Sequence, residues 1–197
     1  MIWITPACLT EKGLKTQRDL IRPLADFVKH CSRIDPNGMV FTMSFAETPK
    51  RILHELKIGH SFILARKNGN IAGALLYSQQ SSQNYHTYFT LVDPSLRRQY
   101  IARDLTFALI RFIRKRGGGT IERVLAQSSS QAWHQKWAKK PARIRVRAGS
   151  PRKPVEQIEV FSREDYPTAR IHVFPSTRQA TAHKTISMKR PLKKRLK

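Results

Sequence analysis

The sequence predicts an α/β (α+β) fold built on a mixed, mostly antiparallel sheet, and three features in the middle of the chain carry that prediction. Residues 61–65 and 71–77 are apolar segments joined through an Asn-Gly pair, the strongest short-range signal for a β-hairpin. Residues 85–92 are expected to form a third strand, which an Asp-Pro pair ends. Residues 100–116 place apolar side chains three and four positions apart, which indicates a long amphipathic helix.

The other elements are expected on both sides of this centre, in one domain over residues 1–174. Before the centre, the sequence predicts a strand at 2–6, a helix at 14–31 with a break or kink at Pro23, a turn at 35–38, a strand at 39–45, and a helix opened by Thr48-Pro49 that reaches Gly59. After the centre, it predicts a strand at 123–126, a short helix that follows 128–130 and carries Trp133 and Trp137, a hairpin of 142–147 with 155–161, and a last strand at 169–174. Residues 175–197 show no periodicity and are interpreted as a basic tail, disordered until bound.

The charge of the chain is far from balanced. Thirty-seven Lys and Arg residues stand against thirteen Asp and Glu residues, a formal net charge of +24. A smaller imbalance would keep a small domain in solution, so this one points to polyanionic partners, which such a field attracts. Nucleic acid, either DNA or RNA, is the expected partner. An anionic membrane surface and an acidic protein are the alternatives.

Composition also argues against several classes of protein. Cys8 and Cys31 are too few for a disulfide framework or a metal cluster, and both are expected to be reduced and buried, as in a cytoplasmic protein that could associate with a nucleoid or nucleus. No signal peptide is expected at the start of the chain, and no stretch is apolar enough to span a membrane. The thirteen acidic residues show no clustering as ligand pairs, so no metal is expected and a metal-dependent nuclease is disfavoured.

The segment before the long helix is the most informative part of the sequence. Free N–H groups and the helix dipole make a helix N-terminus an anion-binding site, and here the approach to it runs from Val92 through Asp-Pro to Ala102. At this point the sequence resembles the GNAT superfamily of N-acetyltransferases. Their signature is a hydrophobic-x-Pro stretch, then Arg/Gln-x-x-Gly-x-Gly/Ala, then the long helix and a glycine. Arg97, Ala102 and Gly117 match that pattern, and residues 69–73 resemble the family's hairpin.

The resemblance covers roughly residues 39–140, and 1–161 as topology, and it implies both a fold and a cofactor. The fold would be a GNAT-like mixed sheet with helices on both faces. The cofactor would be acetyl-CoA or another acyl-CoA, with its pantetheine arm along the backbone of Leu91 and Val92. The strand at Val124 would part from the strand at Leu91, so that the thioester meets an amine between them. The pyrophosphate would be bound by the backbone of Arg97, Arg98, Gln99, Tyr100, Ile101 and Ala102.

Two departures from the family pattern bear on catalysis. Tyr100 stands where the signature has its first glycine, and a Cβ there would narrow the approach of a phosphate. The family often has a tyrosine acid on the helix after the fifth strand, where this chain has Trp133 and Trp137, whose indoles cannot protonate a thiolate. His134 is the candidate acid, and its alternative role is that of a surface residue. His86 is the candidate general base, and its alternative role is that of a strand histidine with a satisfied hydrogen bond.

Basic residues are densest toward the C-terminus and form the candidate nucleic-acid-binding surface. The alternating arginines of the strand at 142–147 and the turn after it are spaced like a phosphate track. The tail would add nonspecific, salt-sensitive binding, while Trp133 and Trp137 either stack on bases or pack in the core. The candidates are Arg143, Arg145, Arg147, Arg152, Lys153, Lys189, Arg190, Lys193, Lys194 and Arg195.

Two functions from different classes are consistent with the sequence. The first is an acyl-CoA-dependent N-acyltransferase that acts on a nucleic-acid-associated amine, either on a basic protein or on a nucleobase; phage DNA-modifying proteins of the Mom type resemble this class. The second is a non-catalytic nucleic-acid-binding protein or particle component on a degenerate GNAT scaffold, which Tyr100 and the basic C-terminus favour. The enzyme is the preferred interpretation.

Overall fold

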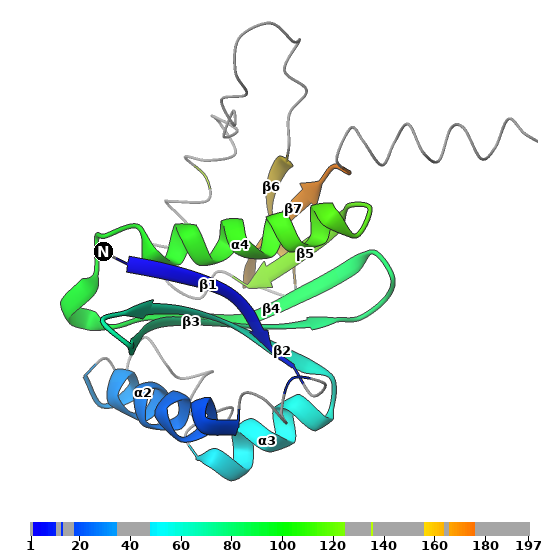
Figure 1. Ribbon diagram of the computed structural model, residues 1–197. Coiled ribbons are helices and arrows are strands. Elements are labelled where there is room, and N and C mark those ends of the chain that lie inside the picture. Colours follow the sequence, from blue (N-terminus) through cyan, green and yellow to red (C-terminus); the bar gives the residue numbers. More distant parts are fainter. Residues whose placement is uncertain are drawn as a thin grey trace, which may run out of the picture.

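Helices cover both faces of one sheet in the computed structural model of the chain, which describes residues 2–10, 13, 18–34, 48–124, 135, 156–163 and 166–175 (Figure 1). Within those residues the sheet has seven strands in the order β1-β2-β3-β4-β5-β7-β6. β4 and β5 run parallel, and every other neighbouring pair of strands is antiparallel. The predicted α/β class and the mixed, mostly antiparallel sheet are confirmed.

The elements follow the chain in a regular order. The strands are β1 (Ile2–Leu9), β2 (His60–Lys67), β3 (Asn70–Gln79), β4 (Asn84–Val92), β5 (Gly119–Val124), β6 (Glu156–Arg163) and β7 (Tyr166–Val173). The helices are α2 (Ile21–Ile34), α3 (Pro49–Lys57) and α4 (Ile101–Lys115), with short 3-10 turns η2 (Arg18–Leu20) and η4 (Pro94–Leu96) before α2 and α4.

Two apolar layers hold the helices on the sheet. α2 and α3 cover one face, where Leu24 and Phe62 are fully buried, and α4 lies across the other face, where its Leu109 and Ile121 of β5 belong to one buried cluster (Figure 1). Since successive residues of a strand point to opposite faces, each strand sends alternate side chains to different helices. This alternation decides which side chains can meet at the functional site.

The predicted centre of the sheet is confirmed in detail. Asn68 and Gly69 both have positive φ, at 51° and 84°, as the favoured two-residue hairpin turn requires. Arg66 closes the turn by donating from Nε and Nη2 to the Gly69 carbonyl, at 3.1 and 2.8 Å. β4 and α4 begin and end within one residue of their predicted bounds.

The first helix differs from its prediction. The sequence places it at 14–31 with a break or kink at Pro23, whereas α2 runs without interruption from Ile21 to Ile34. Pro23 lies in the first turn of α2, where the backbone N–H that proline lacks would have no intrahelical partner. The proline therefore fits the start of the helix and does not break it.

Thr48 caps α3 as the sequence predicts, with Pro49 as the first residue of the helix. The Thr48 hydroxyl accepts a hydrogen bond from the Arg51 backbone N–H at 3.2 Å. We expect Thr48→Ala to lower the free energy of unfolding by about 1 kcal/mol, because it leaves one N–H group without its partner. Urea denaturation measures this, and Thr48→Ser is the control that keeps the bond. An alanine variant as stable as the serine variant would contradict the role of the cap.

The last strands differ from their predictions in their bounds. β5 starts at Gly119, four residues before the predicted 123–126, because Gly118 and Gly119 turn the chain with φ of 90° and 154°. A Cβ on Gly119 would lie 2.5 Å from the Gln83 carbonyl oxygen, so a side chain there would have to displace the backbone. β6 pairs with β7, the strand that follows it, and its predicted pairing with 142–147 lies outside the described residues. The predicted last strand is confirmed as β7.

Several predicted segments lie outside the described residues. These are the turn and strand at 35–45, the hairpin strand at 142–147 and the tail from 176 onward. In the predicted short helix, Gln135 alone is described, and it is helical. In the described part of the chain, Cys31 is a free, buried thiol, and burial raises its pKa to about 12, so it is a poor nucleophile.

Candidate active site

The site begins where β4 and β5 part. Their parallel ladder holds four residue pairs, from Asn84 with Thr120 to Thr87 with Arg123. β4 then continues to Val92 on β3 alone, while β5 continues on β7. Tyr88 is an extra residue in β4, a β-bulge, because Leu76 of β3 pairs with Phe89 and Tyr77 with Thr87. A bulge bends its strand and increases the local twist, so it directs β4 away from β5 at this point.

The loop after β4 is held by local hydrogen bonds. The Asp93 carboxylate accepts from the Ser95 backbone N–H at 2.9 Å and from the Ser95 hydroxyl at 2.7 Å. Partial burial acts to raise the pKa of Asp93, but these hydrogen bonds outweigh it and hold that pKa below its usual value. Asp93 therefore shapes the turn, as the sequence suggested, and an ionised, hydrogen-bonded carboxylate is a weak general base.

The start of α4 offers backbone donors to an anion. Tyr100 is the N-cap residue and makes no side-chain hydrogen bond to the helix. Both Arg98 and Tyr100 have left-handed backbones, with φ of 66° and 61°, a conformation that favours glycine. The Tyr100 ring is 65% exposed and lies 4.5 Å from the Arg103 guanidinium, which holds the ring against the first turn. Tyrosine thus adopts the backbone conformation expected of the glycine it replaces.

Close packing brings this helix start to the end of β4. A Cβ on Gly73 of β3 would lie 2.8 Å from Ile101 Cγ2, 3.1 Å from Leu105 Cδ1 and 3.0 Å from the Leu91 carbonyl oxygen. Gly73 also pairs with Val92 in the sheet. The structure therefore places the predicted pantetheine residues, Leu91 and Val92, beside the predicted pyrophosphate loop.

The loop residues divide into a buried anchor and an exposed surface. Ile101, the first residue of α4, is buried between the helix and the sheet. Arg97, Arg98, Gln99, Tyr100 and Ala102 are exposed. A loop exposed in this way can present its backbone and two guanidinium groups to a ligand.

A row of polar residues crosses the sheet on the face covered by α2 and α3. In register, His60 of β2 pairs with Ser78, Ser78 with His86, His86 with Glu122, and Glu122 with Arg170. The row meets β4 just before its bulge, where β4 leaves β5. His86, the predicted base, therefore lies on the opposite face of the sheet from α4 and next to the point of separation.

Ring contacts and a buried carboxylate organise this polar row. Tyr88 lies between two histidines, with ring centroids 4.5 Å from His60 and 4.8 Å from His86, and its hydroxyl is 3.2 Å from the Ser78 hydroxyl. His60 Nδ1 is 2.6 Å from Glu55 Oε2, and the Glu55 side chain is fully buried. A carboxylate on Nδ1 orients an imidazole and fixes its tautomer.

Sequence reasoning missed Glu55 and His60. The available signal was a charged residue at Glu55, on the apolar face that α3 forms with Ile52 and Leu56. Its partner His60 lies only five residues further on, at the start of the next strand. A carboxylate on a buried helix face, followed closely by a histidine, indicates a paired group.

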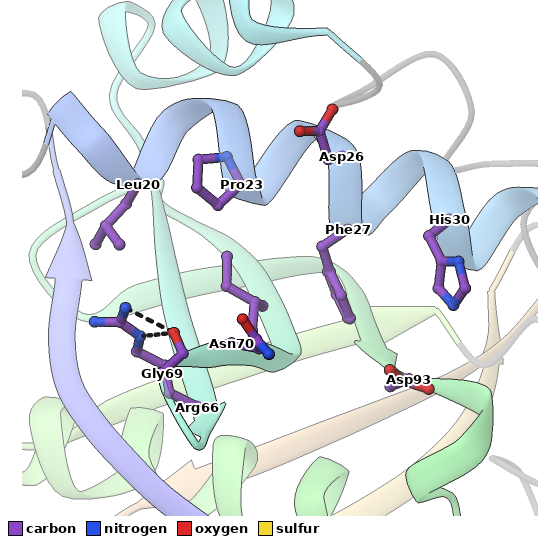
Figure 2. A pocket seen from close by; sticks show the side chains of 10 residues that line it. Leu20, Pro23, Asp26, Phe27, His30, Arg66, Gly69, Asn70 and Asp93 are labelled. Carbon is purple, nitrogen blue, oxygen red and sulfur yellow. Dashed lines mark hydrogen bonds between the residues drawn. The ribbon is translucent and has the colours of Figure 1, made fainter.

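A pocket of about 350 Å³ lies elsewhere, between α2 and the β2–β3 hairpin (Figure 2). Phe27 and His30 point from α2 toward the sheet, and Asp93 closes the far side (Figure 2). Asp93 is six residues along β4 from Thr87, or about 20 Å. The pocket is therefore separate from the point where β4 and β5 part.

Other predicted site residues fall outside the described part of the chain. They are His134 and the basic candidates at Arg143, Arg145, Arg147, Arg152, Lys153, Lys189, Arg190, Lys193, Lys194 and Arg195. Among the described residues, no three His, Cys, Asp or Glu side chains lie together in a way that could hold a metal ion. No helix in the described ranges is long and apolar enough to cross a membrane.

A sheet that opens between two parallel strands beside a helix start without a side-chain cap can receive a ligand that carries phosphate groups. Residues 32–135, which are 104 of the 197 residues, match the family model of the GNAT acetyltransferase domain. The chain therefore belongs to the GNAT acetyltransferase family and is by class an acyl-CoA-dependent N-acyltransferase. No curated protein sequence matches it.

Solved structures agree on the fold. The PaiA N-acetyltransferase from Thermoplasma acidophilum, in complex with coenzyme A, is 11% identical over 86% of this chain and 98% of its own, with a TM-score of 0.57. A ribosomal-protein-alanine N-acetyltransferase from Escherichia coli is 14% identical over 89% and 96%, with a TM-score of 0.54. GCN5 from Tetrahymena is 14% identical over 86% and 96%, with a TM-score of 0.53. The predicted GNAT-like fold is confirmed.

Proposed function

We propose that the protein transfers an acyl group from acetyl-CoA or another acyl-CoA to an amine carried by nucleic acid, or by a basic protein bound to nucleic acid. We infer the class of acceptor from the formal net charge of +24, because a field of that sign concentrates polyanions around the protein. Exposed basic residues also occur at the start of α4 and along its outer face, among them Arg97, Arg98 and Arg111. A polyanion attracted there would bring its amines close to the donor site.

The residues present fit an acyl-CoA. The start of α4 has no side-chain cap, and Gly73 keeps it close to β4, so its N–H groups and dipole can receive a pyrophosphate. Arg97 and Arg98 would add charge to that contact. The end of β4 at Leu91 and Val92 has backbone groups on the side from which β5 has departed, and these would pair with the pantetheine arm. The bound donor supplies an activated acyl thioester.

On the acceptor side, His86 would take the proton that the amine loses on attack. It lies beside the point where the thioester is expected, in the row that also holds Tyr88 and His60. Tyr88 would limit the rotation of the His86 ring, and the Glu55 carboxylate would keep His60 in one orientation on the other side of Tyr88. General base catalysis needs a proton acceptor within reach of the attacking nitrogen, and His86 would be that acceptor.

One observation favours the second candidate function, a nucleic-acid-binding protein that retains the scaffold without turnover. Tyr100 occupies a left-handed position at the expected pyrophosphate site, where its side chain competes for space with a phosphate. Its exposed ring lies 4.5 Å from the Arg103 guanidinium, at the first turn of the helix. Binding of the donor distinguishes the two functions.

The test uses the full chain freed of nucleic acid by a high-salt wash. Calorimetric titration with acetyl-CoA is expected to show one site with micromolar affinity, and transfer of labelled acetyl groups is then measured to duplex DNA, to RNA and to a basic protein bound to either. Binding to a labelled 20-mer duplex is followed in parallel as salt rises from 50 to 200 mM. Six phosphate contacts would weaken it about 10³-fold.

The outcomes separate the parts of the proposal. A folded protein that does not bind acetyl-CoA would exclude the transferase and leave the binding protein. Donor binding together with transfer to free small amines only, and no salt-dependent affinity for DNA or RNA, would exclude the nucleic-acid-associated acceptor. One structural neighbour, the ribosomal-protein-alanine N-acetyltransferase, acts by its name on a protein of a ribonucleoprotein particle, which makes ribosomal proteins a first group of acceptors to test.

A further inference from the structure

A buried arginine lies at the point where β4 and β5 separate. Arg123 ends the parallel ladder opposite Thr87 and is only 9% exposed. Ile121, two residues earlier in β5, packs under α4, so Arg123 faces α4 as well. Its Nε donates to Thr87 Oγ1 at 3.0 Å and its Nη2 donates to Thr106 Oγ1 of α4 at 3.3 Å. The guanidinium thus joins the helix to the end of the ladder.

Both threonines are fully committed to holding this side chain. Thr87 Oγ1 donates its own proton to the Glu122 carbonyl oxygen at 3.3 Å, and Thr106 Oγ1 donates to the Ala102 carbonyl oxygen at 3.0 Å. Each hydroxyl can therefore only accept from Arg123. The guanidinium has five N–H donors, and these bonds use two of them. Arg123 is fixed in orientation while most of its donors stay free of side-chain partners.

The charge of Arg123 has no counter-charge among the described residues. The neighbouring carboxylate, Glu122, faces the other side of the sheet and pairs with Arg170 at 2.6 Å. Burial lowers the pKa of Arg123 to about 10, so the group is still charged at neutral pH. An unpaired buried charge is costly to a fold, which indicates that an anion is its natural partner.

Two groups without a hydrogen-bond partner among the described residues, one on Arg123 and one on Thr90, belong to side chains on the α4 side of the sheet. Nη1 of Arg123 makes no hydrogen bond to another described residue, because the printed bonds of this guanidinium come from Nε and Nη2. Thr90 Oγ1 is buried and has no hydrogen-bond partner there. Val92 packs against the α4 layer, so Thr90, two residues before it in β4, faces α4 too. A guanidinium edge and a free hydroxyl are suitable partners for a carboxylate.

These donors lie at the inner end of the donor site. The start of α4, where the pyrophosphate would bind, is next to Val92, and Thr87 is five residues further along β4, or about 16 Å. That span is comparable to an extended pantetheine arm, so the acyl group would reach the end of the ladder. We propose that Arg123, with Thr87 and Thr106, forms an acyl pocket that selects donors whose acyl group ends in a carboxylate, such as malonyl-CoA or succinyl-CoA. The inference rests on the proposed acyl-CoA site.

The reaction itself is unchanged by this choice of donor. The acceptor nitrogen forms a bond to the thioester carbonyl carbon, the C–S bond breaks, and CoA leaves as the thiolate. The proton from the amine passes to the base and then to the thiolate. The distal carboxylate stays intact and bound to Arg123, so it orients the carbonyl without taking part in any bond change. The product is an amide that adds one negative charge to the acceptor.

The experiment compares donors of matched length on the full chain by calorimetry: succinyl-CoA with butyryl-CoA, malonyl-CoA with propionyl-CoA, and acetyl-CoA as reference. Each pair differs in the terminal group, so the comparison needs no variant. We expect at least one carboxylate-bearing donor to bind about tenfold more tightly than its neutral counterpart. If butyryl-CoA binds as tightly as succinyl-CoA, and propionyl-CoA as tightly as malonyl-CoA, the inference is overturned. The acyl-CoA site itself would then still stand. Failure of every CoA thioester to bind would overturn the site itself.

Variants then assign the selectivity to the arginine. Arg123→Met keeps an unbranched apolar side chain in the buried position and is expected to abolish the preference for the carboxylate-bearing donor of each pair. Arg22→Met, an exposed arginine on α2, is the control and should keep the preference. If Arg123→Met does not fold, Thr106→Val tests the same contact, since it removes one anchor of the guanidinium and should reduce the preference at least threefold. A preference of wild-type size in folded Arg123→Met or folded Thr106→Val protein would overturn the assignment.

Discussion

Replacing His86 with glutamine is expected to lower kcat by about 10²–10⁴-fold, the usual contribution of a general base. Glutamine keeps much of the size and hydrogen-bonding capacity of the imidazole but cannot accept a proton at neutral pH. His86 lies on the face covered by α2 and α3, whereas the donor site is on the α4 side. The affinity for acyl-CoA should therefore be unchanged. The fall in kcat is measured by the release of CoA thiol in the presence of the acceptor amine.

Two further histidines make this prediction selective. His54 is exposed on α3, and His54→Gln is the matched control that should retain full activity. His60→Gln breaks the contact with Glu55 and should lower kcat less than the His86 substitution, because His60 acts through Tyr88. If His86→Gln keeps wild-type kcat while His60→Gln loses it, the base is His60. If neither variant loses activity, the polar row has no catalytic role.

Local signals account for the part of the fold that the sequence predicted well. The Asn68-Gly69 turn, the Thr48 cap with Pro49, and the apolar stripe of α4 each depend on residues within a few positions of one another. Their conformations follow from backbone preferences and helical periodicity. The loop from Arg97 to Ala102 belongs to the same group, because a helix start can be recognised along the chain.

Pairing between distant strands could not be predicted in the same way. The row from His60 through His86 to Arg170 depends on the register of five strands, which no local pattern specifies. The bulge at Tyr88 shifts that register by one residue and so decides which side chains share a face. For the same reason, sequence reasoning read Arg123 as an ordinary strand residue and did not foresee that β4, β5 and α4 would enclose it.

The predicted helix and strand boundaries were wrong where a proline or a glycine is compatible with two different roles. Pro23 can interrupt a helix or lie in its first turn, and the apolar spacing that precedes it favoured the first interpretation. The glycines at 117–119 can be read as the ending of α4, yet Gly119 is already the first residue of β5. In both cases the three-dimensional packing, and not the residue type, decided the outcome.

Gly73→Ala is expected to weaken both the fold and the donor site, because Gly73 is the contact that holds the start of α4 against β4. The added Cβ would lie 2.8 Å from Ile101 Cγ2 and 3.0 Å from the Leu91 carbonyl oxygen, and overpacking of this kind costs about 1–3 kcal/mol. Since the helix start must move to relieve the contact, acyl-CoA affinity should fall at least tenfold.

Gly59→Ala is the control: its Cβ meets nothing within 4 Å, so it carries only the strain of a φ of 89°. Denaturation and calorimetric titration of both variants separate the two effects, since loss of stability alone would appear in both and loss of affinity only at Gly73. A Gly73→Ala protein with wild-type affinity would show that the start of α4 does not bind the donor.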